Sequence, residues 1–102
     1  MGLFKKEKKT KLKDVVEFNG KRISYAVEIL DGEERVLGKN GGIAVNGDCV
    51  ILLLEASEVF RCEIKNIKIG TLMSGNGADI SGLDINQNRQ RHIIAYYSNL
   101  KQ

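Results

Sequence analysis

Apolar and polar residues alternate along short stretches of this chain, and turn dipeptides separate the stretches. In the clearest stretch, Ile23, Tyr25, Val27 and Ile29 alternate with small or polar residues. This period of two predicts a strand with one buried face. Asn-Gly and Asp-Gly favour the positive φ angles of tight hairpin turns, so a small meandering β protein is expected. Five such dipeptides occur: Asn19-Gly20, Asp31-Gly32, Asn40-Gly41, Asn46-Gly47 and Asn76-Gly77.

Further strands are expected on both sides of these turns. Residues 15–18 read as a short strand that ends at Asn19-Gly20, and the apolar run 50–54 as a central strand covered on both faces. The glycine-rich residues 38–42 are expected to form a mobile loop between strands. The last element, 92–97, has the β-branched and aromatic content of a strand, although its apolar positions also suit one face of a helix.

The alternation changes phase after Ile64. Phe60, Cys62 and Ile64 share one phase, whereas Ile67 and Ile69 have the other. A slip of one residue moves side chains to the opposite face, so a bulge or bend is predicted near residues 65–66. The whole pattern predicts an all-β fold: a small single-domain barrel or sandwich of about eight short, mostly antiparallel strands, in a mainly up-and-down order.

Charge is concentrated at the N-terminus. The net charge is +3, but residues 1–13 hold six lysines and one acid, while residues 14–102 hold ten basic and twelve acidic residues. We therefore divide the chain into a basic flexible tail, 1–13, and a single β domain, 14–102. The candidate contacts to an anionic membrane surface are the tail lysines: Lys5, Lys6, Lys8, Lys9, Lys11 and Lys13. The alternative is a solvated leader that has no partner.

The composition indicates the compartment. The sequence shows neither a secretory signal nor an apolar run of about 18 residues, so a cytoplasmic protein, peripheral at most to the inner face of the membrane, is expected. Cys49 and Cys62 then read as reduced, buried thiols, although cross-strand pairing on one face would allow a disulfide.

Two polar segments resemble ion-binding loops but lack essential positions. Residues 84–88 begin like a calcium loop, but Arg89 stands where the sharp turn needs glycine and Ala95 where a glutamate should bind. Residues 74–79 resemble one copy of a glycine-rich calcium repeat that requires stacked copies. Both segments are interpreted as turns, and neither a metal nor a cofactor is expected.

Three classes of function fit this composition. The first is a non-catalytic binding or scaffold module, which meets a protein partner or a second copy through a strand edge. The second is a nucleic-acid-binding barrel of the OB or SH3-like kind. The third is a small enzyme that uses His92, the only histidine, with Asp79, Asp84 or Ser81 on the preceding strand. We favour the first and expect no catalytic residue. The candidate nucleic-acid contacts are Arg89, Arg91, Tyr96 and Tyr97.

One stretch resembles a known class of proteins. The segments 42–45, 50–54 and 59–67, which end in Arg61-Cys62-Glu63-Ile64-Lys65-Asn66-Ile67, resemble strands of bacterial pleckstrin-homology-like and GRAM-type barrels. The resemblance implies a small β-barrel followed by a C-terminal helix that would begin near Arg91.

Overall fold

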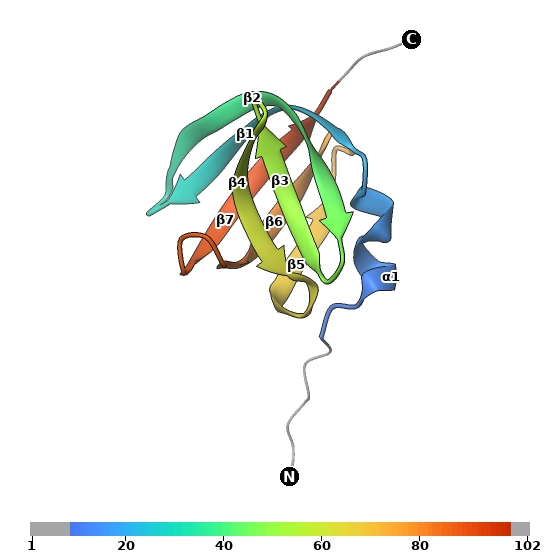
Figure 1. Cartoon of the computed structure of the whole chain (residues 1–102). Coiled ribbons are helices and arrows are strands. Elements are labelled where there is room, and N and C mark those ends of the chain that lie inside the picture. Colours follow the sequence, from blue (N-terminus) through green and yellow to red (C-terminus); the bar gives the residue numbers. More distant parts are fainter. Residues whose placement is uncertain (1–8, 99–102) are drawn as a thin grey trace.

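One curled sheet makes up most of the fold (Figure 1). The computed structural model describes residues 9–98. Seven antiparallel strands follow a short helix, and the sheet closes about half of a barrel. The elements are α1 (Leu12–Val15), the 3₁₀ turn η1 (Val16–Phe18), β1 (Arg22–Leu30), β2 (Glu33–Asn46), β3 (Cys49–Leu54), β4 (Ser57–Glu63), the 3₁₀ turn η2 (Ile64–Asn66), β5 (Ile67–Thr71), β6 (Gly77–Asp84) and β7 (Arg89–Tyr97).

The strand order is β4-β3-β2-β1-β7-β6-β5, so the sheet consists of two meanders joined where β1 pairs with β7. β4 and β5 are consecutive in the chain but lie at opposite edges of the sheet. η2 connects them at the point where the apolar phase changes, which confirms the bend predicted near residues 65–66. The predicted all-β fold is confirmed, with seven strands in place of about eight.

Two of the predicted hairpin turns are confirmed. Asp31 and Gly32 have φ angles of 51° and 80° and join β1 to β2. Gly47, with a φ of 65°, lies in the turn between β2 and β3. The link from β3 to β4 uses Glu55 and Ala56, both at positive φ, in a turn without glycine.

The strand predicted for residues 15–18 is wrong. These residues belong to α1 and η1, and Val15 and Phe18 are both buried in the core, at 0% and 2% exposed. Side chains three residues apart meet on one face of a helix, but on a strand they would point to opposite faces. Asn19-Gly20 therefore follows a helical turn and joins no hairpin.

The loop predicted for residues 38–42 is also wrong, because these residues continue β2. Asn40 has a φ of 55°, which bends the strand without ending it. Gly41 lies so close to β3 that a Cβ atom would stand 1.7 Å from the Leu53 carbonyl oxygen. The glycines thus let a long strand bend and pass close to its neighbour.

β1 changes its inward face at a bulge. Between Ile23 and Tyr25 it contains one residue more than the facing part of β7. Ile23 and Ala26 both lie in the core, whereas Tyr25 is 41% exposed. The single buried face predicted for this strand is therefore wrong beyond the bulge, where Glu28 takes an inward position and is 3% exposed.

The predictions for the last two apolar segments hold. β3 is buried at five of its six positions, which confirms a covered strand, although it lies next to the sheet edge. Residues 92–97 form the greater part of β7, a strand that begins earlier, at Arg89. A strand therefore occupies the position where the C-terminal capping helix was expected to begin, near Arg91.

The boundary predicted after residue 13 falls inside α1, and residues 1–8 of the predicted flexible tail lie outside the described part of the chain. Among residues 9–98, no helix has the length and apolar character required to cross a bilayer.

Replacing Gly41 tests the close approach of β2 to β3. Gly41→Ala should lower the free energy of unfolding by about 1–3 kcal/mol, because the new Cβ clashes with backbone that cannot move without separating two strands. The measurement is urea denaturation followed by circular dichroism. Gly70→Ala is the matched control, since a Cβ there meets nothing within 4 Å. Equal stability of the two variants would contradict the predicted contact.

Candidate functional site

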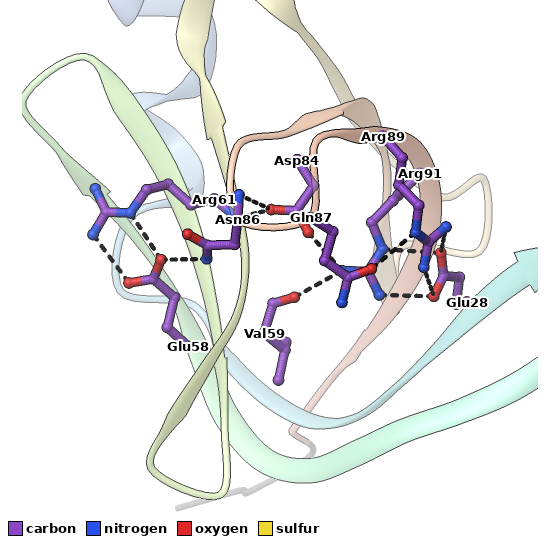
Figure 2. A network of polar contacts seen from close by, with 9 residues as sticks. All are labelled: Glu28, Glu58, Val59, Arg61, Asp84, Asn86, Gln87, Arg89 and Arg91. Carbon is purple, nitrogen blue, oxygen red and sulfur yellow. Dashed lines mark hydrogen bonds and ion pairs between the residues drawn. The ribbon is translucent and has the colours of Figure 1, made fainter.

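A buried ion-pair network lies inside one end of the half-barrel (Figure 2). The Arg91 guanidinium on β7 donates two hydrogen bonds to the Glu28 carboxylate on β1, at 2.9 and 2.7 Å. It donates a third to the Asp84 carboxylate at the end of β6, at 2.7 Å. Arg91, Glu28 and Asp84 are 5%, 3% and 0% exposed. Three strands are therefore held together by charge-assisted bonds out of contact with water.

The same network binds the backbone of β4, the strand at one edge of the sheet. Arg91 donates to the Val59 carbonyl oxygen at 2.9 Å, and Asp84 accepts the Arg61 backbone N–H at 3.2 Å. The Ile85 N–H donates to the Arg61 carbonyl oxygen at 2.8 Å. The Val59 carbonyl group and both backbone groups of Arg61 are thus satisfied, and the middle of this edge is covered.

The charges stabilise one another. Hydrogen bonds from Arg91, and more weakly from Arg89, hold the pKa of Glu28 below its ordinary value, although burial opposes this shift. The bonds to Glu28 also raise the pKa of Arg91. Arg89 contributes a partly exposed ion pair to Glu28 at 3.1 Å. Both shifts favour the charged forms of Glu28 and Arg91, which are paired with each other.

An outer layer continues the network at the protein surface (Figure 2). Arg61 makes a bidentate pair with Glu58 at 2.8 and 3.0 Å, and the Asn86 side-chain amide donates to Glu58 at 2.8 Å. These bonds lower the pKa of Glu58 to about 2. The turn between β6 and β7 is in this way attached to β4.

The opposite edge of the sheet, β5, is organised differently. The Leu72 N–H donates to the Gly77 carbonyl oxygen, and Leu72 and Gly77 are opposite each other in the register of β5 and β6. Antiparallel ladders alternate between hydrogen-bonded and non-hydrogen-bonded pairs. Gly70 and Lys68 therefore bond to β6, whereas Ile67, Ile69 and Thr71 direct their N–H and C=O groups away from it.

The surroundings of β5 agree with this assignment. The Thr10 hydroxyl donates to the Ile67 carbonyl oxygen at 2.6 Å from the side opposite β6. Within residues 9–98, no hydrogen bond reaches the outward N–H and C=O groups of Ile69 and Thr71. Gly70 and Thr71 are exposed, and space is open where a Gly70 side chain would stand. β5 thus presents a short unpaired edge, which is the candidate binding site.

The residues considered for nucleic-acid binding do not form one surface. Arg91 is buried and paired, and Arg89 is paired with Glu28 at the same end of β7. Tyr96 is stacked on Tyr25 on the outer face, with ring centroids 4.7 Å apart. Tyr97 lies against the core, about 20 Å along the strand from Arg91. Arginines and tyrosines are thus at opposite ends of the strand and on both of its faces.

The tail lysines are described only in part. Lys9, Lys11 and Lys13 are exposed at the start of the described chain, while Lys5, Lys6 and Lys8 lie outside it. The membrane contact assigned to these lysines stays a prediction.

His92 does meet one of its expected partners. Its Nε2 atom lies 2.8 Å from the Asp79 carboxylate, and Ser81 is directly opposite in the ladder. Asp84 instead belongs to the buried network. The His92–Asp79 pair is about half exposed, at 43% and 48% of each side chain, so solvent screens it. The catalytic alternative that uses His92 stays a prediction.

The two cysteines are not cross-strand partners. Cys62 is opposite Val50, while Cys49 is opposite Glu63, so the thiols are offset by one position and point to opposite faces. Both are free and buried, and burial raises the pKa of Cys62 to about 11. Within residues 9–98, no group of three or more acidic, histidine or cysteine side chains is arranged to hold a metal.

Neither a protein-family model, nor a curated protein, nor a solved structure matches this chain. The resemblance to pleckstrin-homology-like and GRAM-type barrels therefore stays a prediction.

Sequence reasoning missed the role of the ion-pair network. The sequence pattern predicts Arg91 at a surface and Asp84 in a polar turn. It places Glu28 on the polar face of its strand, opposite Val27 and Ile29, because the bulge in β1 leaves no mark on the apolar pattern. The available signal was an acid within an otherwise apolar strand and an arginine within another, since buried charges require partners.

Removing the central cation tests the network. Arg91→Met should lower the free energy of unfolding by about 3–5 kcal/mol at neutral pH, because two buried carboxylates lose their partner. The pKa of Glu28 is lowered in the folded protein, so the wild type loses this stabilisation as the pH falls below 4.5. Urea denaturation at neutral and acid pH should show a deficit that shrinks towards acid pH.

Arg89→Met is the control for that change. Its side chain is 40% exposed and contributes an outer ion pair, so its loss should cost less than about 1 kcal/mol. Equal effects of the two substitutions, or an Arg91→Met deficit that is independent of pH, would contradict the assigned role of the network.

Proposed function

We propose that this protein is a non-catalytic binding module that takes up an extended segment of a protein partner along the free edge of β5. The supporting observation is the pair of residues, Ile69 and Thr71, whose outward N–H and C=O groups bond to no described residue. A partner strand would satisfy these four groups and extend the sheet.

The difference between the two edges supports this proposal. In β4 the Val59 carbonyl group bonds to Arg91, and the Arg61 N–H and C=O groups bond to Asp84 and Ile85. An unpaired edge can pair with other chains, and proteins commonly cover or charge such edges. A module that binds one partner strand requires one accessible edge, here β5, and one covered edge, here β4.

The side chains of β5 suggest what the partner strand carries. Lys68 is exposed, and its side chain points to the face opposite that of Ile69. An acidic residue beside Lys68 would form a cross-strand ion pair. Ile69 is half-buried against the core and offers an apolar contact on the other face. We therefore infer an extended segment that alternates acidic and apolar residues.

We place the module in the cytoplasm, with its lysine-rich N-terminus near the inner face of a membrane. Lys9, Lys11 and Lys13 are exposed, and six of the first thirteen residues are lysines. Each lysine near an anionic lipid surface contributes about 1 kcal/mol, so the tail would concentrate the module there without an anchor.

Blocking one backbone donor tests the edge. Thr71→Pro should weaken binding of an extended peptide at least tenfold, because proline removes an outward N–H without breaking the ladder to β6. The probe is the tightest acidic–apolar peptide selected from a displayed library, measured by calorimetry. In ¹⁵N spectra the amides of Lys68 and Gly70 should exchange slowly without peptide, and those of Ile69 and Thr71 only after its addition.

Thr71→Val is the matched control, because it retains the N–H and the β-branched shape and should bind within threefold of the wild type. The proposal fails if proline and valine at this position bind the peptide equally, or if the peptide leaves the Ile69 and Thr71 amides unprotected. If the Ile69 and Thr71 amides became protected from exchange at high protein concentration without peptide, the strand that pairs with β5 would be that of a second copy of the chain.

Neutralising the N-terminal lysines tests the membrane contact. Changing the six lysines of residues 1–13 to glutamine should reduce co-sedimentation with phosphatidylserine-rich vesicles at least tenfold, because the attraction is electrostatic. Raised salt should have the same effect on the unchanged protein. Equal partitioning of the two proteins, or equal binding to phosphatidylcholine vesicles, would remove the membrane contact from the proposal.

A further inference from the structure

A hollow of about 570 Å³ opens on the outer face, at the end of the sheet away from the ion-pair network. It lies between the stacked rings of Tyr25 and Tyr96 and the turn that joins β5 to β6. Its volume is within the range of about 300–1,000 Å³ that is typical of small-molecule sites. Its lining includes the side chains of Ser24, Tyr25, Ser74, Asn76, Tyr96 and Ser98.

The lining is aromatic and polar, and it contains no charged residue. Tyr25 is 41% exposed, and its ring is stacked on Tyr96 with an angle of 25° between the planes. The face of an aromatic ring carries partial negative charge, which attracts weakly positive C–H groups. An exposed, supported tyrosine ring is therefore a platform for the C–H face of a ligand ring.

Hydrogen-bonding groups surround this platform. Ser74 Oγ bonds to Asn76 Oδ1, which leaves the two N–H donors of the Asn76 amide directed elsewhere. Within residues 9–98, no hydrogen bond involves Ser98 Oγ or the phenol hydroxyl groups of Tyr25 and Tyr96. These four groups provide both donors and acceptors of hydrogen bonds.

We propose that this hollow is a binding site for a neutral saccharide, separate from the β5 edge. A saccharide ring combines a face of C–H groups, which packs on Tyr25, with hydroxyl groups that both donate and accept hydrogen bonds. The Asn76 amide and the Ser98 hydroxyl group bind its equatorial hydroxyl groups. The uncharged lining matches a ligand without phosphate or carboxylate.

A nucleotide fits this lining less well. A base can stack on a tyrosine, but its phosphate requires a cation or a cluster of backbone N–H groups. The arginines of β7 lie at the opposite end of the strand and are engaged with Glu28 and Asp84. Neutral rings that carry hydroxyl groups are therefore favoured over nucleic acid.

The test is a ¹⁵N titration with cellotetraose, maltotetraose and chitotetraose, with 5′-AMP as the charged aromatic competitor. We expect at least one oligosaccharide to shift the amides of Tyr25, Asn76 and Tyr96 with a dissociation constant of about 1 mM, as the few contacts of a shallow site allow. Tyr25→Ala should weaken that binding at least tenfold, whereas Tyr25→Phe, which keeps the ring, should weaken it less than threefold.

Val36→Ala is the matched control, because Val36 is exposed on the same face of the sheet but lies outside the hollow. It should bind the oligosaccharide as the wild type does, and thermal melts should show that all variants fold. The proposal is overturned if no oligosaccharide shifts these amides, if Tyr25→Ala binds unchanged, or if 5′-AMP occupies the hollow in preference to every oligosaccharide. Thr71→Pro should leave saccharide binding unchanged, so the proposal for the β5 edge and the proposal for the hollow are tested independently.

Discussion

The guanidinium group of Arg91 holds the curled sheet in its shape. It bonds to β1 through Glu28, to the end of β6 through Asp84 and to the backbone of β4 through Val59. β4 and β6 are not neighbours in the sheet, so these bonds connect the strand at one edge to a strand near the other. Desolvating three charges is costly, so the intact network adds little net stability, although removing one partner leaves the others buried and unpaired.

This constraint makes the two edges of the sheet chemically different. Curling brings β4 against the end of β6, where Asp84 and Ile85 satisfy its outward backbone groups. Because β4 meets the end of β6, the next strand, β5, lies beyond this contact at the other edge of the sheet. The exposed edge at Ile69 and Thr71 thus follows from the position of the ion pairs, and the binding site proposed there depends on a network that lies outside it.

Much of the fold could be predicted from local patterns, because hairpin turns and alternation are local properties. Asp31-Gly32 has the positive φ angles that its residue types favour, and the phase change after Ile64 marks the real corner. The pattern failed where tertiary packing overrode it. Val15 and Phe18 both reach the core from a helical turn, whose period places side chains three residues apart on one side of the chain.

The candidate sites could not be predicted from local patterns, because they depend on the register in which the strands pair. Whether a β5 residue directs its N–H inward or outward depends on how β5 and β6 are paired, which the apolar pattern does not specify. The hollow combines residues near positions 24, 75 and 97, which meet only because β1 pairs with β7 and β7 with β6. A bulge adds one residue to β1 between Ile23 and Tyr25 and brings the Tyr25 ring to the outer face, beside Tyr96. One inserted residue thus moves Glu28 inward, towards the network that closes the sheet, and the Tyr25 ring outward, to the platform of the proposed saccharide site.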